Sequence, residues 1–444
     1  MSATPAFGAQ LPDVRVRPPG PASRALADRL RAVESRNVTY VDDDWPVFWD
    51  AARGSNVRDA DGNVYVDLTG GFGVAFLGHA HPAVAEAVAR QTDRLVQGMG
   101  DVHPPALKVA LLERLAEFAP WAETRGVLAS TGSEAVEIAL KTAQLATGKP
   151  GVLAFEGGYH GLTLGALSVT SRTLFRAPFE RRLYAGVAFA PFPAASAAAS
   201  LARVREFLRR GAPNGDPIGA VIVEPVQGRA GVRIAPAGFM AALSDVAAEA
   251  GALVIADELL TGMGRCGAML ASSRVGLRPD LVCLGKALGA GVPLSACLGS
   301  RAVMDAWPES RGEAMHTSTF LGHPLACAAA LAALDTYASG AVLKRAEALG
   351  ARLGSRLTER LSGVRGVVQV RGLGLFLGVE LTSEEPGSAA PAARVAAAAL
   401  KEGVLVLPAG EAGQVLELAP AVALTDEQTD HAVEVLVRAI EEAL

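Results

Sequence analysis

Cysteine is scarce in this chain, and its pattern excludes two common uses of the residue. Four cysteines occur among 444 residues: Cys266, Cys283, Cys297 and Cys327. None of them forms a CxxC pair, and no histidine-rich tract accompanies them. A disulfide framework and a zinc site are therefore not expected, and we expect no bound metal. This use of cysteine fits a reducing compartment.

Charge of one sign and long apolar runs are also lacking. The formal net charge is only −5, and no basic stripe or polybasic run is present. No uninterrupted apolar run reaches the roughly 18 residues of a membrane span. The Pro- and Ala-rich start lacks the charged beginning and apolar core of a signal peptide. We therefore expect a cytoplasmic protein that binds neither nucleic acid nor membrane.

The residues that are abundant predict a large, folded chain. Hydrophobic residues make up 50% of the sequence and charged residues 20%, which is enough apolar surface for a sizeable core. The length suits two packed domains. We expect a loose N-terminal arm over the first 22 or so residues. The predicted organisation is an arm and small-domain segment over residues 1–68, a large domain over 69–335 and a C-terminal small domain over 336–444.

The centre of the chain alternates strands with helices. Apolar runs at 152–155, 187–190, 220–223, 252–256 and 281–284 are typical of buried strands. Amphipathic stretches at 134–147, 199–210 and 237–249 predict helices between them. This alternation predicts an α/β fold with a mainly parallel sheet and helices on both faces. After about residue 335 the pattern changes to that of a smaller α+β domain.

Polar residues gather where the predicted strands end. Glu224, Asp257, Glu258 and Lys286 each follow an apolar run. In open parallel sheets, ligands bind beyond the carboxyl ends of the strands. These four residues are therefore the first candidates for a functional site.

Lys286 and Asp257 carry the strongest chemical signal. A lysine in a Gly-rich loop after a buried strand has a lowered pKa and becomes a better nucleophile toward a carbonyl. A carboxylate at a strand end needs a cationic partner, which the pyridinium nitrogen of pyridoxal phosphate would supply. Each residue also has a plainer interpretation. Lys286 could bury only its aliphatic chain and extend its amine to solvent, and Asp257 could be an ordinary capping carboxylate.

Two loops could complete such a site. Ser130-Thr-Gly-Ser-Glu-Ala135 precedes a predicted helix, so its backbone N–H groups and hydroxyls would bind an anion. The alternative is a capping box, in which Ser or Thr is followed by Glu134 or Glu137. The segment Gly157-Gly-Tyr-His-Gly161 offers Tyr159 for stacking on a planar cofactor, or is only a surface turn.

Taken together and in order, these segments resemble the class III aminotransferases, within fold type I of the pyridoxal-phosphate enzymes. The similarity runs from about Phe48 to Val435. It is carried by Asp67-Leu-Thr-Gly-Gly71, Leu77-Gly-His-Ala-His-Pro82, Thr131-Gly-Ser-Glu-Ala135, Tyr159-His-Gly161, Glu224-Pro-Val-Gln-Gly228, Asp257-Glu258, Thr261-Gly-Met-Gly-Arg265, Gly285-Lys286, Thr319-Phe320 and Val370-Arg-Gly372.

The resemblance implies an enzyme that binds pyridoxal 5'-phosphate and moves an amino group from an amine to a carbonyl in two half-reactions. Lys286 would hold the cofactor as a Schiff base and shuttle a proton, and Asp257 would pair with the pyridine nitrogen. The remaining cofactor-binding residues would be Thr131, Gly132, Ser133, Tyr159, His160, Ser318 and Thr319. In this family a pair like Ser318-Thr319 reaches the phosphate of the neighbouring subunit. A homodimer with shared sites is therefore implied.

Departures from the family pattern concern the substrate. Leu260 stands where many relatives have a glutamine near the cofactor's phenolic oxygen, and His323 stands in a usual Gly-Asn-Pro. Many relatives bind the substrate carboxylate with an arginine and gate it with a glutamate. Here the corresponding positions are Glu417 and Arg229, so the charges are exchanged. We predict that Arg229 and Glu417 form an ion pair that lines the substrate pocket, where Arg229 could bind a carboxylate of the substrate or Glu417 could bind its amine. The alternative is a purely structural bridge between the two residues. Phe72 is a further predicted substrate residue.

Three other functions remain open from sequence. Residues 262–267 match GxGxxG, as in a dinucleotide-binding dehydrogenase, but they follow the apolar run too late and no helix opens at the last glycine. His79-Ala-His81 could indicate a metal hydrolase, although no carboxylate cluster follows. A racemase or aminomutase would use the same lysine and cofactor.

Overall fold

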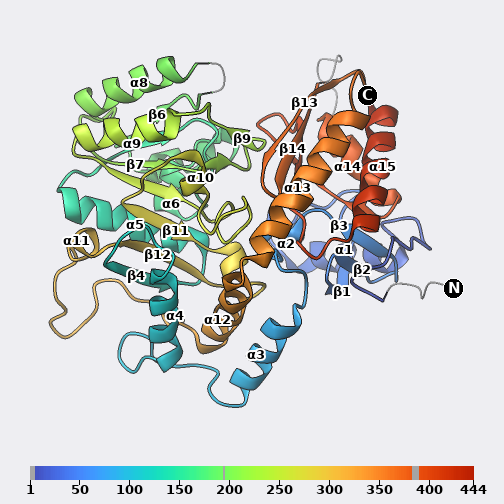
Figure 1. Cartoon of the computed structure of the whole chain (residues 1–444), viewed down its shortest axis with the longest axis horizontal. Coiled ribbons are helices and arrows are strands. Elements are labelled where there is room, and N and C mark those ends of the chain that lie inside the picture. Colours follow the sequence, from blue (N-terminus) through green and yellow to red (C-terminus); the bar gives the residue numbers. More distant parts are fainter. Residues whose placement is uncertain (1–5, 194–195, 383–389) are drawn as a thin grey trace. The chain divides into compact units, whose positions relative to one another are not determined.

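The computed structural model describes residues 6–193, 196–382 and 390–444, which form two compact units (Figure 1). Met1–His81 and Glu347–Leu444 make up the first unit, and Pro82–Ala346 make up the second. The first unit thus joins the two ends of the chain, while the second is continuous and contains most of the predicted site residues.

A seven-stranded sheet forms the centre of the second unit. Its order is β4-β12-β11-β10-β7-β5-β6, and only β12 runs against the others. The strands are β4 (Thr124–Ala129), β5 (Gly151–Phe155), β6 (Val187–Ala190), β7 (Ile218–Val223), β10 (Leu253–Asp257), β11 (Leu281–Leu284) and β12 (Ser295–Ser300). The five apolar runs predicted as strands are β5, β6, β7, β10 and β11, so the prediction of a mainly parallel α/β fold is confirmed.

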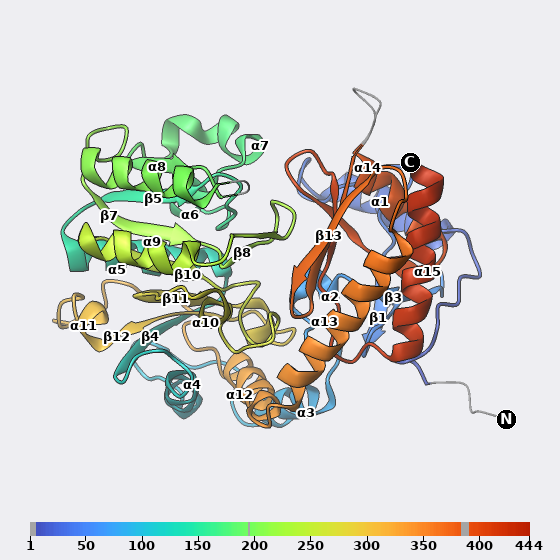
Figure 2. The same ribbon diagram turned by 45° about the horizontal axis from the view of Figure 1, so that its top comes forward.

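Helices flank this sheet (Figure 2). The three helices predicted from amphipathic periodicity are present as α5 (Gly132–Thr147), α8 (Ala197–Arg210) and α9 (Phe239–Glu249). Helix α5 packs across β4, β12, β11, β10 and β7, whereas α8 and α9 pack against each other and against β5, β6 and β10. The remaining helices of the unit are α3 (Pro82–Thr92), α4 (Ala106–Ala116), α6 (Leu164–Val169), α7 (Thr173–Arg176), η1 (Ala177–Arg182), α10 (Ala271–Val275), η2 (Lys286–Leu288), α11 (Arg301–Met304) and α12 (Pro324–Ala338). A short hairpin of β8 (Val226–Gln227) and β9 (Arg233–Ile234) follows β7.

The core of the second unit lies between α5 and the central strands. Ile222, Ile255 and Leu281 come from three neighbouring strands, and Val136 and Ile138 come from α5; all are fully buried. Branched apolar side chains favour strands and pack well on a pleated surface. The same burial makes the strand ends rigid supports for the polar residues that follow them.

The first unit contains two four-stranded sheets covered by helices. One has the order β1-β2-β3-β15 and the other β13-β14-β17-β16. Strand β15 from the C-terminal segment pairs in parallel with β3 from the N-terminal segment. The elements are α1 (Pro21–Val33), β1 (Trp49–Arg53), β2 (Asn56–Asp59), β3 (Val64–Asp67), α2 (Gly70–Gly73), α13 (Ala341–Arg360), β13 (Val367–Leu373), β14 (Phe376–Leu381), α14 (Pro391–Lys401), β15 (Val404–Leu405), β16 (Leu407–Ala409), β17 (Val415–Leu418) and α15 (Asp426–Ala443).

The prediction of a loose N-terminal arm is wrong for residues 8–16. Asn56 Oδ1 accepts hydrogen bonds from the backbone N–H groups of Gly8 and Gln10, both at 3.0 Å. Asn63 Oδ1 accepts one from Val16 N at 2.9 Å. The buried side chains of Asn56 and Asn63 thus accept hydrogen bonds from backbone N–H groups of the arm. The arm's composition alone did not indicate these partners.

Across the described ranges, no single helix is long and apolar enough to cross a membrane. Helices α12 and α13 reach those criteria only when they are taken together as a broken pair.

Candidate active site

The predicted site segments of the second unit leave the sheet at one edge. Strands β10 and β11 are parallel neighbours in which Asp257 lies opposite Cys283, so Lys286 follows at the same edge as Asp257. Strands β5 and β7 run in the same direction, so the loops that carry Tyr159 and Glu224 also emerge there. Strand β4 is parallel to β11, because both pair antiparallel with β12, and α5 begins directly after it. Topology therefore gathers residues that are far apart in the sequence.

Lys286 has an unusual backbone conformation. Its φ is 44°, which residues other than glycine rarely adopt. It begins the short helix η2, in which the Ala287 carbonyl accepts a hydrogen bond from Tyr337 Oη at 3.1 Å. A Cβ at the preceding Gly285 would lie 2.7 Å from Leu259 Cδ2, so a larger residue would require the Leu259 side chain to shift. Strain of this kind persists where the surrounding packing imposes it, often at functional sites.

Asp257 and His160 form a buried pair. His160 Nδ1 lies 2.7 Å from Asp257 Oδ2, and the two residues are only 2% and 3% exposed. Asp257 Oδ1 also accepts the backbone N–H of Leu259 at 3.1 Å. Burial by itself lowers the pKa of the imidazole. The hydrogen bond and charge of Asp257, together with the charge of Glu224, outweigh that effect and raise the pKa of His160 above its ordinary value.

Glu224 is a second buried carboxylate in this group, at the carboxyl end of β7. Its Oε1 accepts the backbone N–H of Tyr159 at 3.0 Å, and its Oε2 accepts that of Gly228 at 3.0 Å. Burial raises the pKa of Glu224, the charge of His160 lowers it and the charge of Asp257 raises it. The resulting pKa of Glu224 is about 7. Glu224, His160 and Asp257 are therefore electrostatically linked.

Tyr159 and Arg229 lie near one another. Tyr159 is half-buried, and its ring meets that of Phe175 edge-on with 5.8 Å between centroids. Burial raises the pKa of the Tyr159 phenol, whereas the positive charges of Arg229 and Arg172 lower it. Arg229 is itself half-buried and lies at the tip of the β8–β9 hairpin. The structure thus brings a predicted substrate residue close to a predicted cofactor residue.

The start of α5 contains the capping box that was the alternative interpretation of this segment. Thr131 Oγ1 accepts the backbone N–H of Glu134 at 3.3 Å, and Glu134 Oε2 accepts that of Thr131 at 2.8 Å. The Thr131 hydroxyl is therefore engaged in the cap. Backbone N–H groups of the first turn remain the natural donors for an anion, because helix N-termini attract negative charge.

Close approach of two segments shapes the surroundings of this helix start. A Cβ at Gly161 would lie 2.2 Å from Ser133 Oγ, and a Cβ at Gly132 would lie 2.8 Å from Leu259 Cδ1. Ser133 Oγ accepts the backbone N–H of Leu162 at 3.3 Å. Glycine at 161, where φ is also 118°, is therefore required for the 157–161 loop to lie against the start of α5, whereas a side chain at 132 would displace Leu259.

Ser318 and Thr319 lie in the stretch between α11 and α12. The Thr319 carbonyl accepts a hydrogen bond from Gln97 Nε2 at 2.7 Å, and Thr317 Oγ1 donates one to Asp101 Oδ2 at 2.7 Å. This stretch is therefore joined to the loop between α3 and α4.

The other predicted substrate residues belong to the first unit. Glu417 lies on β17 opposite Gly378 of β14 and is buried, with 6% of its surface exposed. Phe72 lies in α2 with a φ of 60° and is 64% exposed. Leu260 of the second unit, which replaces the family's glutamine, is buried just after β10.

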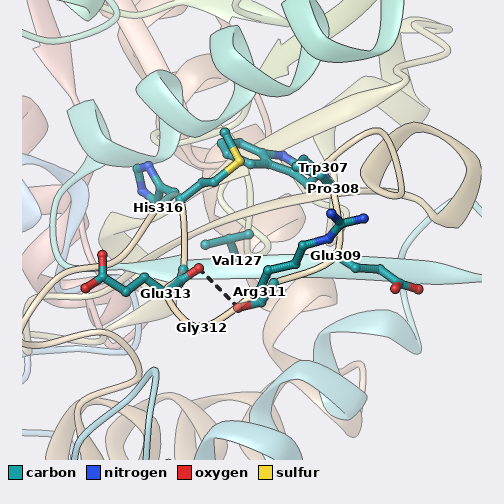
Figure 3. A pocket seen from close by; sticks show the side chains of 11 residues that line it. Val127, Trp307, Pro308, Glu309, Arg311, Gly312, Glu313 and His316 are labelled. Atoms are coloured by element: carbon teal, nitrogen blue, oxygen red, sulfur yellow. Dashed lines mark hydrogen bonds between the residues drawn. The ribbon is translucent and has the colours of Figure 1, made fainter.

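A cavity of about 930 Å³ lies on the second unit beside β4 (Figure 3). Its wall is Val127 and the loop from Trp307 to His316, which includes Arg311 and Glu313. None of the predicted site residues is part of this lining. Because no predicted site residue lines it, this cavity is separate from the candidate active site.

The structure does not support the two competing sites. Residues 262–267 form turns rather than a strand-to-helix junction, and the next helix, α10, begins only at Ala271. His79 Nε2 lies 2.8 Å from Asp67 Oδ2, so this histidine is held by a carboxylate of the same unit. Within residues 6–193, 196–382 and 390–444, no group of three or more His, Cys, Asp or Glu side chains could hold a metal ion.

Comparisons with known proteins agree with this geometry. Residues 39–440 match the model of the family described as aminotransferase class-III. The chain is 40% identical over 344 residues to acetylornithine aminotransferase of Methanopyrus kandleri, covering 77% of this chain and 82% of that protein. It is 34% identical to 4-aminobutyrate aminotransferase of Mycobacterium leprae, covering 95% and 96%. An amine transaminase from an uncultivated Pseudomonas species, solved with pyridoxal phosphate bound, superposes with a TM-score of 0.84 at 32% identity, covering 93% and 99%.

The chain belongs to the class III aminotransferases. It is a pyridoxal-phosphate-dependent transferase that acts on small-molecule amino and keto compounds. The family, fold class, enzyme class and cofactor predicted from sequence are thereby confirmed. The arrangement of this chain fits the cofactor: a half-buried lysine, a buried carboxylate and a glycine-lined helix start share one edge of the sheet.

Sequence reasoning missed two contacts in this site. His160 was placed among the cofactor-binding residues without a partner, and Glu224 was only an acidic residue after an apolar run. The available signal was that Glu224, like Asp257, would be a buried carboxylate in need of donors. Its partner Tyr159 was not predictable, because it lies 65 residues away, and its partner Gly228, four residues away, depends on the turn that the chain makes after β7.

Proposed function

We propose that Lys286 holds pyridoxal phosphate through a covalent bond from its Nζ, and that Asp257 faces the pyridine nitrogen. The observation that carries this assignment is the register of β10 and β11, which brings both residues to one edge of the sheet. The first turn of α5, with Thr131, Gly132 and Ser133, would hold the phosphate. Tyr159 would lie on the ring face.

Each residue then has a defined task. When bound, pyridoxal phosphate supplies a conjugated ring that accepts the electrons released as the donor's carbon loses a proton. The Lys286 amine takes that proton and returns it at another carbon, which requires an amine with a lowered pKa. Asp257 keeps the ring nitrogen protonated, and His160 holds the Asp257 carboxylate in place through the bond at 2.7 Å.

We propose a donor with an amine at one end and a carboxylate at the other. Relatives of this chain are named 4-aminobutyrate aminotransferase and 5-aminovalerate aminotransferase, and both names describe such compounds. Arg229 is the proposed ligand of the carboxylate, because it is a half-buried cation close to Tyr159. Glu417 and Phe72 stay predicted substrate residues on the strength of the sequence alone.

A spectroscopic titration tests the cofactor assignment. Purified protein is loaded with pyridoxal phosphate, and its visible band is followed as 4-aminobutyrate, 5-aminovalerate or alanine is added. We expect an ω-amino acid to bleach the band and a keto acid to restore it. Lys286→Ala should lose the band of the bound cofactor. Lys149→Ala is the matched control, because Lys149 is a partly buried lysine whose Nζ binds the Ala250 carbonyl at 3.0 Å.

The result also separates the alternatives. If Lys286→Ala keeps a normal visible band and full turnover, the assignment of the lysine is wrong. A persistent band with exchange of the donor's α-hydrogen would indicate a racemase or mutase instead. For the substrate residues, we expect Glu417→Gln to change donor preference; unchanged preference and affinity would remove Glu417 from the substrate site.

We further propose a homodimer in which Ser318 and Thr319 bind the phosphate of the partner subunit. Two loops of the second unit, joined by the Gln97–Thr319 hydrogen bond, expose large apolar side chains. Clusters of this kind mark protein interfaces. The exposed residues are Leu95, Val96, Met99, Val102, Met315 and Phe320.

Mixed dimers test this arrangement directly. A Lys286→Ala protomer is combined with a protomer that carries Ser318→Ala and Thr319→Ala. If sites are shared, one site of the mixed dimer receives all the defects and the other receives none. Activity should then return to about half of wild type per mixed dimer. Activity no higher than the mean of the two parent variants would show that each site is built from one chain.

A cytoplasmic location is also proposed. It rests on the four cysteines, which are all buried as free thiols, as expected for a reducing compartment.

A further inference from the structure

We propose that Glu224 is a positioning residue that ties the loop carrying Tyr159 to the hairpin carrying Arg229, and so sets affinity for the carboxylate of the donor. This inference rests on the proposed roles of Tyr159 and Arg229. It goes beyond them by identifying the residue that holds the loop carrying Tyr159 and the hairpin carrying Arg229 in fixed positions relative to each other.

The first connection runs to the loop after β5. Glu224 Oε1 accepts the backbone N–H of Tyr159 at 3.0 Å. Earlier in the loop, the backbone N–H of Gly157 donates to Ser171 Oγ at 2.7 Å and that of Gly158 donates to the Phe155 carbonyl at 3.0 Å. The loop is thus anchored at its start by its own neighbours, whereas the peptide that carries the Tyr159 ring is held by Glu224.

The second connection runs to the hairpin. Glu224 Oε2 accepts the backbone N–H of Gly228 at 3.0 Å. The Gly228 carbonyl accepts the N–H groups of Gly231 at 2.8 Å and Val232 at 3.1 Å. The peptide groups on both sides of Gly228 are therefore fixed, and Arg229 follows directly. Glu224 therefore holds the backbone of the hairpin tip at the residue directly before Arg229.

The chemistry of the side chain explains why a carboxylate serves this purpose. Each of its two oxygens faces one N–H donor, and the residue is only 7% exposed, so water cannot substitute. A glutamine has the same shape but only one accepting oxygen, and its NH₂ group would face an N–H donor. A single isosteric change therefore breaks one of the two connections without opening a cavity.

Hydrogen exchange of the cofactor-free protein tests the connection without relying on activity. The exchange is measured at pH 8, because the pKa of Glu224 is about 7 and both oxygens accept only when the carboxylate is ionised. In Glu224→Gln, we expect amides in residues 157–161 or 228–232 to exchange roughly tenfold faster than in wild type, the effect of losing about one buried hydrogen bond. Glu224→Asp is the second variant; its shorter side chain cannot reach both donors. Circular dichroism confirms that each variant is folded.

Glu258→Gln is the matched control. Glu258 is also a buried carboxylate that accepts two backbone N–H groups, from Ala271 at 3.0 Å and Ser272 at 2.6 Å. Its loss should accelerate exchange near residues 271–272 and leave 157–161 and 228–232 as in wild type.

Steady-state kinetics then test the consequence for the substrate. The donors 4-aminobutyrate and butylamine differ only in the carboxylate. We expect Glu224→Gln to raise KM for 4-aminobutyrate by roughly tenfold, with a smaller change in kcat and little change in KM for butylamine.

The outcomes separate this inference from the proposed function. Unchanged exchange in both segments of Glu224→Gln and Glu224→Asp, or equal shifts in KM for the two donors, would overturn the role of Glu224. If wild-type protein instead uses neither donor, the proposed substrate class fails, while the exchange experiment still decides whether Glu224 connects the two segments.

Discussion

Replacing His160 should expose how much the buried pair with Asp257 contributes to stability. Two substitutions separate its effects. His160→Phe keeps a ring of similar shape but has no donor for Asp257 Oδ2. His160→Asn keeps a neutral donor in nearly the position of Nδ1. Because the pair is 2.7 Å apart and almost fully buried, the two variants should differ clearly.

The magnitude follows from what remains around Asp257. Removing one partner of a buried ion pair costs about 3–5 kcal/mol, because the other charge is left uncompensated. Asp257 keeps the N–H of Leu259 at 3.1 Å, so we expect a loss of about 3 kcal/mol for His160→Phe. His160→Asn should lose about 1 kcal/mol, since a neutral hydrogen bond replaces a charged one.

The pH dependence has a definite sign. The pKa of His160 is raised in the folded protein relative to its ordinary value of 6.5. The stabilisation that it contributes is therefore fully present below about pH 6.5 and declines as the pH rises through the raised value. The difference between wild type and His160→Phe should accordingly shrink at alkaline pH.

Urea unfolding of the cofactor-free protein at pH 6, 7, 8 and 9 measures these differences. A double-mutant cycle with Asp257→Asn should give a coupling energy of about 1.5–3 kcal/mol at pH 6. The reasoning would be refuted if His160→Phe lost less than about 0.5 kcal/mol at pH 6, or if its loss grew with rising pH.

Two further predictions concern the backbone and the second carboxylate. Gly161→Ala should lower stability by about 2–3 kcal/mol and weaken cofactor binding, because φ is 118° and the new Cβ would meet Ser133 Oγ at 2.2 Å. Gly148→Ala, at φ 66° with open space around it, should lose only about 1 kcal/mol, and thermal melts compare the two. The pKa of Glu224 is raised from 4.5 to about 7, so its ionised form is disfavoured by folding. Stability of wild type relative to Glu224→Gln should therefore fall by about 3 kcal/mol between pH 4.5 and 7, and a flat difference across that range would contradict it.

Local pattern was enough to predict the elements of the second unit. The strands at 152–155, 187–190 and 281–284 were readable because each is a short apolar run, buried on both faces of the sheet, and α5 because its apolar positions recur at helical spacing. The ends of these strands also indicated where polar residues would gather. In the first unit the same approach failed for the arm, whose order depends on Asn56 and Asn63, more than 40 residues away.

The family, the cofactor and the candidates Lys286 and Asp257 could be predicted from the amino-acid sequence, because they follow from ordered motifs and residue chemistry. How the site is held together became visible only in the folded chain. It placed His160 against Asp257, and it gave Glu224 two backbone donors on separate segments. A buried carboxylate must find donors, but loop packing settles which donors reach it, as it brings His160 to Asp257 and Tyr159 to Glu224 across 97 and 65 residues.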